Sequence, residues 1–272
     1  MRFARFIQQG RSSYAIAGDD TITPIDGTPF GTWQPSGSPI PLGQARLDVP
    51  VVPANFYAIG LNYAGHVQER ARLGGAAAQL PTRPEPGYRS VNALVAHGQP
   101  IVLPADTTTV QYEGELVVVI GRRAKHVRES EALQCVLGYT IGNDISERNW
   151  QKIDRSFWRC KNSDTFKPMG PWIETEVDLD ALRTSVRVNG RTQIEFATND
   201  MIFGVARCIA AITEYITLHP GDVIWMGTEG ASTDLHPGDV VEVEISSIGT
   251  LRNPVVAGTS QRGSSVADHA TQ

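Results

Sequence analysis

The densest apolar run in the chain covers residues 116–120, Leu-Val-Val-Val-Ile, and it follows directly on a Glu-x-Glu pair. Because side chains alternate between the two faces of a strand, Glu113 and Glu115 share one face with Val117 and Val119. A run that is apolar on both faces is typical of a buried strand, so both carboxylates are predicted to point into surroundings of low dielectric. Two like charges there are costly unless they are protonated, paired or neutralised by a cation. A divalent metal would neutralise both, and a solvated strand start is the open alternative.

The same alternation of polar and apolar positions predicts mostly strands in the rest of the chain. Strands are expected at residues 2–8 and 13–17, within a small N-terminal β/loop segment at 1–50, and then at 55–61, 100–104 and 137–144. Residues 182–188 and 191–195 form a predicted hairpin, because Asn189 and Gly190 give a strong type I′ turn signal. Helices are expected after Asn62, over 130–136 and, with clear amphipathic spacing, over 201–217. The fold class is therefore α+β and mainly β.

The domain boundaries follow from turn-rich and polar stretches. Residues 51–257 form the expected main domain, and residues 258–272 are small and polar, which is typical of a disordered tail. The stretch 74–98 is rich in Ala, Pro and Gly, and a lid or binding loop and simple surface variation are equally compatible with it. The two His-Pro-Gly-Asp-Val repeats at 219–223 and 236–240 are interpreted as type II turns that each precede a strand.

Composition excludes several classes of function. The 272 residues carry a net charge of −5, which argues against nucleic-acid or anionic-membrane partners. No apolar run approaches transmembrane length, and the N-terminus lacks the apolar core of a secretory signal, so a cytoplasmic protein is expected. The three cysteines, Cys135, Cys160 and Cys208, lack C-x-x-C spacing and are expected to be free thiols.

A candidate general base lies at the start of the first predicted helix. Asn62 is expected to cap this helix and Gly74 with Gly75 to end it. His66 and Glu69 are three residues apart, so they share one helix face. A carboxylate beside an imidazole raises its basicity and orients it, as a general base requires. An ordinary solvated pair is the alternative.

A third carboxylate follows the strand at 137–144. Asp144 lies 29 residues beyond Glu115, a span that fits a helix and a returning strand, so it can arrive beside the two glutamates. Three carboxylates with no candidate His or Cys ligand nearby favour Mg²⁺ or Mn²⁺, with Ca²⁺ less suitable. Taken alone, Asp144 is more often a cap for a helix at 145–148.

Two further stretches carry candidate chemistry. Lys161 lies in an irregular polar and aromatic segment and could stabilise a developing oxyanion, although a single Lys is usually a surface residue. Gly227 and Thr228 follow a predicted strand, and the hydroxyl and backbone amides there could hold a substrate carboxylate.

Several stretches taken together resemble the fumarylacetoacetate hydrolase family in the family's own order, over roughly residues 55–256. They are residues 60–63 (GLNY) with His66 and Glu69, 112–116 (YEGEL), 138–140 (GYT) with Asn143 and Asp144, Lys161 with Asp164, 170–172 (GPW), 199–203 (NDMIF), 220–224 (PGDVI) with Gly227 and Thr228, and 249–253 (GTLRN). The resemblance implies a mixed β-sandwich roll with a few helices, and a homodimer.

The resemblance also implies roles for the candidate residues. Metal ligands are Glu113, Glu115 and Asp144 for Mg²⁺ or Mn²⁺; catalytic residues are His66 and Glu69, which activate water, and Lys161, which supports an enolate. The implied activity is metal-dependent hydrolysis of a C–C bond in an acylpyruvate-like 2,4-dioxo acid. Alternatives are decarboxylation of oxaloacetate, isomerisation or dehydration of a 2-oxo acid, or a catalytically silent metabolite-binding protein. The expected partner is a small 2-oxo acid, with no nucleic acid and no membrane.

Two departures from the family pattern concern the substrate. Residues 88–92 read Tyr-Arg-Ser-Val-Asn where many members have an aromatic residue followed by Lys-Pro, and Glu229 replaces the Pro of Gly-Thr-Pro. Arg89 is predicted to bind a second carboxylate, with a solvated loop position as the alternative. The predicted substrate contacts are Asn62, Tyr63, Arg89, Gly227 and Thr228, and the acyl-group preference is left open.

Overall fold

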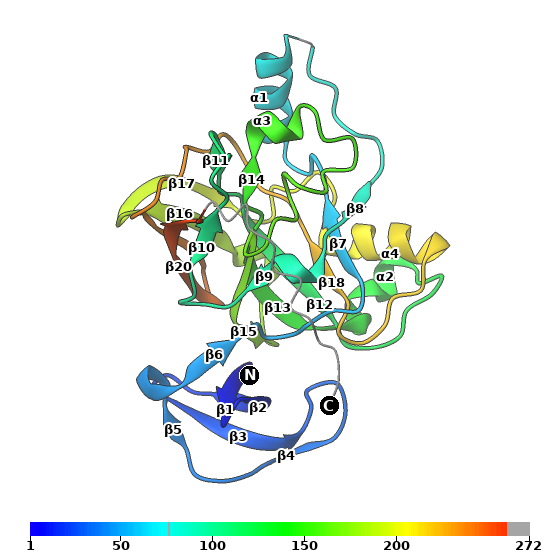
Figure 1. Cartoon of the computed structure of the whole chain (residues 1–272). Coiled ribbons are helices and arrows are strands. Elements are labelled where there is room, and N and C mark those ends of the chain that lie inside the picture. The colour runs from blue at the N-terminus through cyan, green and yellow to red at the C-terminus, as the bar shows by residue number, and fades with distance from the viewer. Residues whose placement is uncertain (76, 260–272) are drawn as a thin grey trace, which may run out of the picture.

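The N-terminal strands extend the main sheet of the molecule. In the computed structural model, which describes residues 1–75 and 77–259, this segment lies at one end of the molecule (Figure 1). Its strands are β1 (Arg2–Gln8), β2 (Arg11–Ala17), β3 (Thr21–Gly27), β4 (Trp33–Pro35), β5 (Ile40–Pro41) and β6 (Arg46–Asp48). β1 pairs antiparallel with β15 (Lys167–Glu174). The first segment is therefore joined to the rest of the chain by backbone hydrogen bonds.

The main sheet continues from β15 with the order β15-β13-β12-β18-β7-β8, and β9 pairs with β15 at its side. These strands are β7 (Phe56–Ile59), β8 (Pro86–Tyr88), β9 (Leu94–Val95), β12 (Gly114–Ile120), β13 (Val136–Asn143) and β18 (Val223–Trp225). β12 is buried along its whole length, as its double-sided apolar pattern predicts. The strand that carries the glutamates thus lies inside the sheet and not at an edge.

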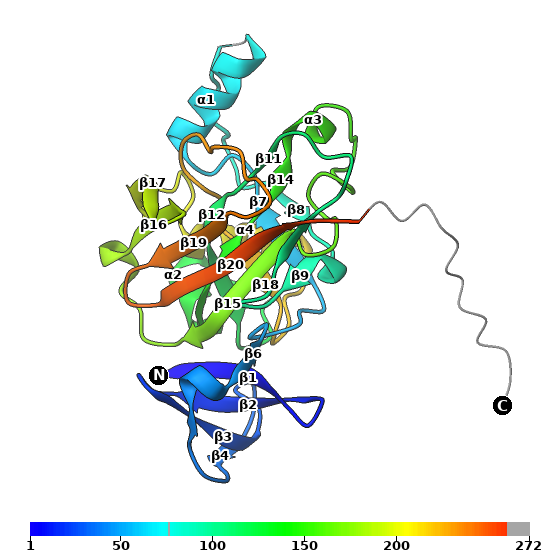
Figure 2. The ribbon, with the colours of Figure 1, turned by 60° about the vertical axis from the view of Figure 1, so that its left-hand side comes forward.

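A second sheet packs against one face of β12. It has the order β10-β20-β19-β16-β17, and a small pair, β11 with β14, lies beside it (Figure 2). The strands are β10 (Ile101–Leu103), β11 (Val110–Gln111), β14 (Ser146–Glu147), β16 (Arg183–Val188), β17 (Arg191–Ala197), β19 (Val240–Ile245) and β20 (Gly249–Ala257). Leu116 and Val118 pack in one core with Val243, whereas Val117 packs on the opposite face with Trp225. This two-layered, mainly β architecture confirms the predicted fold class.

Helices are short and peripheral. They are α1 (Ala64–Gly74), α2 (Glu129–Ala132), α3 (Arg148–Gln151) and α4 (Val205–Tyr215), with 3₁₀ turns at Leu42–Gln44, Val91–Ala93, Leu133–Cys135 and Leu179–Ala181. α4 lies beside α2 on one flank of the sheet (Figure 1). It begins at Val205 and not near Met201, because Met201 forms a β-bridge with Tyr63. No helix in the described ranges is both long and apolar enough to span a bilayer.

The turn predictions have mixed outcomes. Asn189 and Gly190 both have positive φ (53° and 74°), which confirms the type I′ hairpin between β16 and β17. Gly75 adopts the left-handed conformation that ends α1, also as predicted. Asn62 as helix cap is wrong: Tyr63 holds the cap position without a side-chain bond. From residue 260 on, the predicted tail lies outside the described residues.

Candidate metal centre and active site

Antiparallel pairing of β12 with β13 brings three carboxylates together. Glu115 lies opposite Gly142, and the backbone N–H of Asp144, just past the end of β13, donates to the carbonyl oxygen of Glu113 at 2.8 Å. The three side chains are buried, and one carboxylate oxygen from each lies within 4.8 Å of the others. Asp144 is not a helix cap, because α3 is capped by Glu147. The predicted position of Asp144 beside the two glutamates is therefore confirmed.

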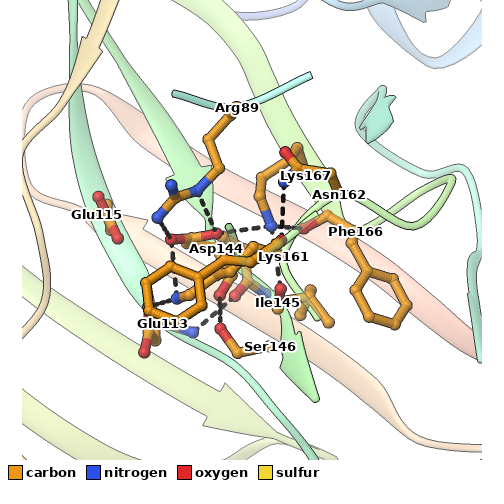
Figure 3. A network of polar contacts seen from close by, with 12 residues as sticks. Arg89, Glu113, Glu115, Asp144, Ile145, Ser146, Lys161, Asn162, Phe166 and Lys167 are labelled. Atoms are coloured by element: carbon orange, nitrogen blue, oxygen red, sulfur yellow. Dashed lines mark hydrogen bonds and ion pairs between the residues drawn. The ribbon is translucent and has the colours of Figure 1, made fainter. Parts of the chain in front are cut away.

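Four cationic side chains contact two of these carboxylates. Lys161 Nζ lies 2.6 Å from Glu113 Oε2 and 3.0 Å from Asp144 Oδ2 (Figure 3). Arg148 Nη1 lies 2.7 Å from the second oxygen of Glu113. On Asp144, Lys167 Nζ lies 2.6 Å from Oδ1 and Arg89 Nη2 lies 2.8 Å from Oδ2. The solvated-loop alternative for Arg89 is wrong, because its side chain is only 9% exposed.

The third carboxylate, Glu115, is neutralised by no ion pair among residues 1–75 and 77–259. Its Oε2 accepts a 2.7 Å hydrogen bond from the backbone N–H of Gly227, and Figure 3 shows its side chain apart from the charged network. Burial, together with the neighbouring carboxylates of Asp144 and Glu113, raises the pKa of Glu115 well above its ordinary value. The site therefore has a buried carboxylate that lacks a counter-charge.

The other two carboxylates stay ionised. Burial alone would raise the pKa of Glu113, but Lys161 and Arg148 outweigh it and lower the pKa to about 2. Burial acts in the same direction on Asp144, yet its surrounding cations hold its pKa well below the ordinary range. The three carboxylates offer only oxygen atoms as donors, and one of them, Glu115, has no cationic partner within the described part of the chain. Such a set suits a hard divalent cation, so the residues present fit Mg²⁺ or Mn²⁺.

His66 is oriented by a backbone carbonyl. Its Nδ1 lies 3.0 Å from the carbonyl oxygen of Gly230, which can only accept, so Nδ1 carries the proton and Nε2 is left as the basic nitrogen. Burial lowers the pKa of His66, with the negative charge of Glu113 acting in the opposite direction. Glu69 accepts two hydrogen bonds from Arg72, at 2.7 Å each, and none from His66. The hydrogen bonds of His66 and Glu69 thus go to other groups, although both side chains line the same chamber, and their joint role in activating water stays a prediction.

Asn62 and Tyr63 use their polar side-chain atoms within the protein. Asn62 Nδ2 donates to the carbonyl oxygens of Phe203 and Met226, and its Oδ1 accepts from the N–H of Phe203. The hydroxyl of Tyr63 donates to the carbonyl of Thr198 at 2.6 Å. A substrate contact from either residue stays a prediction.

Eight of the eleven predicted site residues line one cavity of about 400 Å³, whereas Asn62, Tyr63 and Glu69 do not line it. Its walls include His66, Arg89, Glu113, Glu115, Asp144, Lys161, Gly227 and Thr228. A second chamber of about 620 Å³ lies beyond His66 and shares His66, Arg70 and Gln151 with the first. Its remaining walls are mainly polar or charged, including Glu69 and Lys152. The carboxylates thus line the first cavity, and His66 lies in the wall between it and the second chamber.

Sequence reasoning missed Arg148 and Lys167. Lys167 opens a strand that is otherwise almost entirely buried, so a charge at that position was the available signal for a buried ion pair. Arg148 follows Glu147 at the start of a short helix, where a surface position is the ordinary expectation. Nothing in its local pattern indicated a contact with Glu113.

Comparison with known proteins gives matches over nearly the whole chain. The sequence model described as "Fumarylacetoacetate (FAA) hydrolase C-terminal" matches residues 55–256, and one described as "Rv2993c-like, N-terminal" matches residues 1–50. The chain is 39% identical over 231 residues to Protein Rv2993c of Mycobacterium tuberculosis, covering 84% of this chain and 85% of that protein. It is 37% identical over 279 residues to a 2,4-didehydro-3-deoxy-L-rhamnonate hydrolase of Sphingomonas sp., covering 94% and 96%.

An oxaloacetate tautomerase of Rattus norvegicus, mitochondrial Fahd2a, is 33% identical, with 80% of this chain and 71% of that protein covered. Among solved structures, a 5-carboxymethyl-2-hydroxymuconate delta-isomerase from Mycobacterium smegmatis superposes with a TM-score of 0.85 at 35% identity, over 95% of this chain and all of that one. A maleylpyruvate hydrolase from Sphingobium sp. in complex with Mn²⁺ and pyruvate gives 0.77 at 26% identity, over the same shares. The chain therefore belongs to the fumarylacetoacetate hydrolase family.

Proposed function

We propose that this protein is a divalent-metal-dependent hydrolase that cleaves a C–C bond in an acylpyruvate-like 2,4-dioxo acid. The observation that carries the proposal is that a buried carboxylate trio, an ammonium and a basic imidazole nitrogen line one cavity. Relatives named as hydrolases of maleylpyruvate and of a didehydro-deoxy sugar acid support the reaction class. Glu113, Glu115 and Asp144 would hold the Mg²⁺ or Mn²⁺ ion, which supplies Lewis-acid polarisation of the 2-oxo group when bound.

The protein's own groups account for the remaining steps. His66 Nε2 takes a proton from water, and the resulting hydroxide oxygen bonds to the distal C4 carbonyl carbon. The C3–C4 bond then breaks, its electron pair passes to C3, and protonation of C3 gives pyruvate, while the acyl part leaves as a carboxylic acid. Lys161 donates a hydrogen bond to the C2 oxygen, where negative charge develops. The second chamber, which shares His66 with the first, would receive the acyl group, and Glu69 and Lys152 in its wall could form hydrogen bonds with a polar acyl group.

Tautomerisation or decarboxylation of oxaloacetate is the second candidate. It is favoured by one observation: Glu69 is paired with Arg72 and does not orient His66 toward a water. A tautomerase moves only a proton and needs no activated water, and the rat relative carries that activity in its name. The two reactions use the same carboxylate trio.

Turnover by metal-stripped protein separates the candidates. Oxaloacetate and acylpyruvates with methyl or hydroxylated acyl groups are assayed with and without Mg²⁺ or Mn²⁺, beside Glu115→Gln. Metal-dependent release of pyruvate from an acylpyruvate, absent in the variant, is expected. Enol–keto conversion or decarboxylation of oxaloacetate without acylpyruvate cleavage would refute hydrolysis. A His66→Ala variant should still bind Mn²⁺ while C–C cleavage falls by at least about a hundredfold, the scale of general-base catalysis.

A further inference from the structure

Asp144 has more cationic partners than either glutamate. In addition to the ion pair with Lys167 on Oδ1, Arg89 contacts both oxygens, with Nη2 2.8 Å from Oδ2 and Nε 3.3 Å from Oδ1. Lys161 adds a contact of 3.0 Å to Oδ2. A carboxylate offers about four lone-pair positions, and these four N–H contacts match that number. A cation that binds Asp144 must therefore displace one of these donors.

The donors differ in how firmly they are held. Lys167 is fully buried, and its Nζ also donates to the carbonyl oxygens of Ile145 and Phe166, at 3.0 and 2.8 Å (Figure 3). Arg89 lines the cavity itself, and its guanidinium has one further hydrogen bond, to the carbonyl of Tyr88. Arg89 is thus the donor that contacts both oxygens of Asp144 and at the same time lines the cavity.

We infer that Arg89 competes with the divalent cation for Asp144 and, once displaced, binds the carboxylate of the 2-oxo acid. This inference rests on the function proposed above. A guanidinium that loses its buried carboxylate partner needs a new one, because an unpaired buried charge is costly. The planar fork of Arg89 matches a substrate carboxylate as well as it matches Asp144. Metal and substrate then bind cooperatively: the metal frees Arg89 to pair with the substrate carboxylate, and that carboxylate pairs with the guanidinium that the metal has displaced.

The test measures Mn²⁺ binding to metal-stripped protein by calorimetry, with and without oxalate as a planar stand-in for the 2-oxo acid. In Arg89→Gln, Mn²⁺ should bind at least about tenfold more tightly than in the wild type, the scale of outer-sphere effects on metal affinity. Oxalate should tighten Mn²⁺ binding strongly in the wild type and much less in the variant. The matched control is Arg70→Gln, which removes a cavity-lining cation that contacts none of the three carboxylates.

The outcomes are separable. Unchanged or weaker Mn²⁺ binding in Arg89→Gln, or an undiminished effect of oxalate, overturns the inference while leaving the metal site in place. Failure of both the wild type and the variant to bind Mn²⁺ refutes the proposed function together with it. Binding that is lost in Glu115→Gln places the ion at the trio. If Arg89→Gln does not unfold cooperatively, Arg89→Lys replaces it; this variant loses the fork and should bind Mn²⁺ several-fold more tightly, and an unchanged affinity overturns the inference.

Discussion

Replacing Asn62 by Ala should destabilise the protein by about 3 kcal/mol. The side chain is 1% exposed and makes three hydrogen bonds, at 3.1, 2.9 and 2.9 Å, that tie the start of α1 to Phe203 and Met226. Each is a neutral bond with a net value of about 1 kcal/mol, and truncation leaves one N–H and two carbonyls short of a partner. At about 2–4 °C per kcal/mol for a chain of this size, the melting temperature should fall by about 6–12 °C.

Urea unfolding followed by circular dichroism measures the effect, beside Asn199→Ala as a matched control. Asn199 is exposed and makes one side-chain hydrogen bond, of 3.3 Å to Asp180, so its loss should stay within about 0.5 kcal/mol. Asn62→Asp should cost at least as much as Asn62→Ala, because it turns a carboxylate oxygen toward two carbonyls. If Asn62→Ala unfolds within about 1 kcal/mol of the wild type while oxalate affinity collapses, the side chain is chiefly a ligand contact and the structural reasoning is refuted.

Two further predictions concern the strands around the site. Burial and two nearby carboxylates raise the pKa of Glu115 well above its ordinary value, so the unfolding free energy of metal-free protein should fall as the pH rises past the ordinary Glu range. This fall should be smaller in Glu115→Gln. Urea unfolding measures it, and an equal change of unfolding free energy with pH in both proteins between about pH 5 and 8 would contradict the shift. Gly142→Ala would place a Cβ 2.6–2.8 Å from the buried ring of Trp225 and should cost about 1–3 kcal/mol, whereas Gly43→Ala, with open space around it, should be nearly neutral in the same assay.

The sequence predicted those parts of the site that follow from local rules. A strand that is apolar on both faces is buried, and a returning strand places its end beside the start of the first, so Glu113, Glu115 and Asp144 were predictable together. Turn chemistry likewise predicted the hairpin at Asn189 and Gly190. These inferences need only the alternation of side chains along a strand and the pairing of neighbouring strands.

The missed features depend on long side chains and backbone groups from distant segments. Arg148 reaches Glu113 from a helix start, and Lys167 reaches Asp144 from the beginning of another strand, so neither contact has a local pattern. The group that orients His66 is the carbonyl of Gly230, and a backbone carbonyl has no side-chain identity to recognise in a sequence. Proximity along α1 favoured Glu69 instead, but Arg72 on the same helix competes for that carboxylate.

The distribution of charge among the carboxylates indicates what the site is built to hold. Two carboxylates contact four cationic side chains, whereas Glu115 has only a backbone N–H. A divalent cation beside Glu115 would relieve that imbalance but would leave the cavity with an excess of positive charge. An anionic substrate reduces this excess, because its carboxylate can pair with the cations that line the cavity. On this argument the metal ion gives Glu115 a cationic partner, and the 2-oxo acid offsets the positive charge that the metal adds, so each ligand is expected to favour binding of the other.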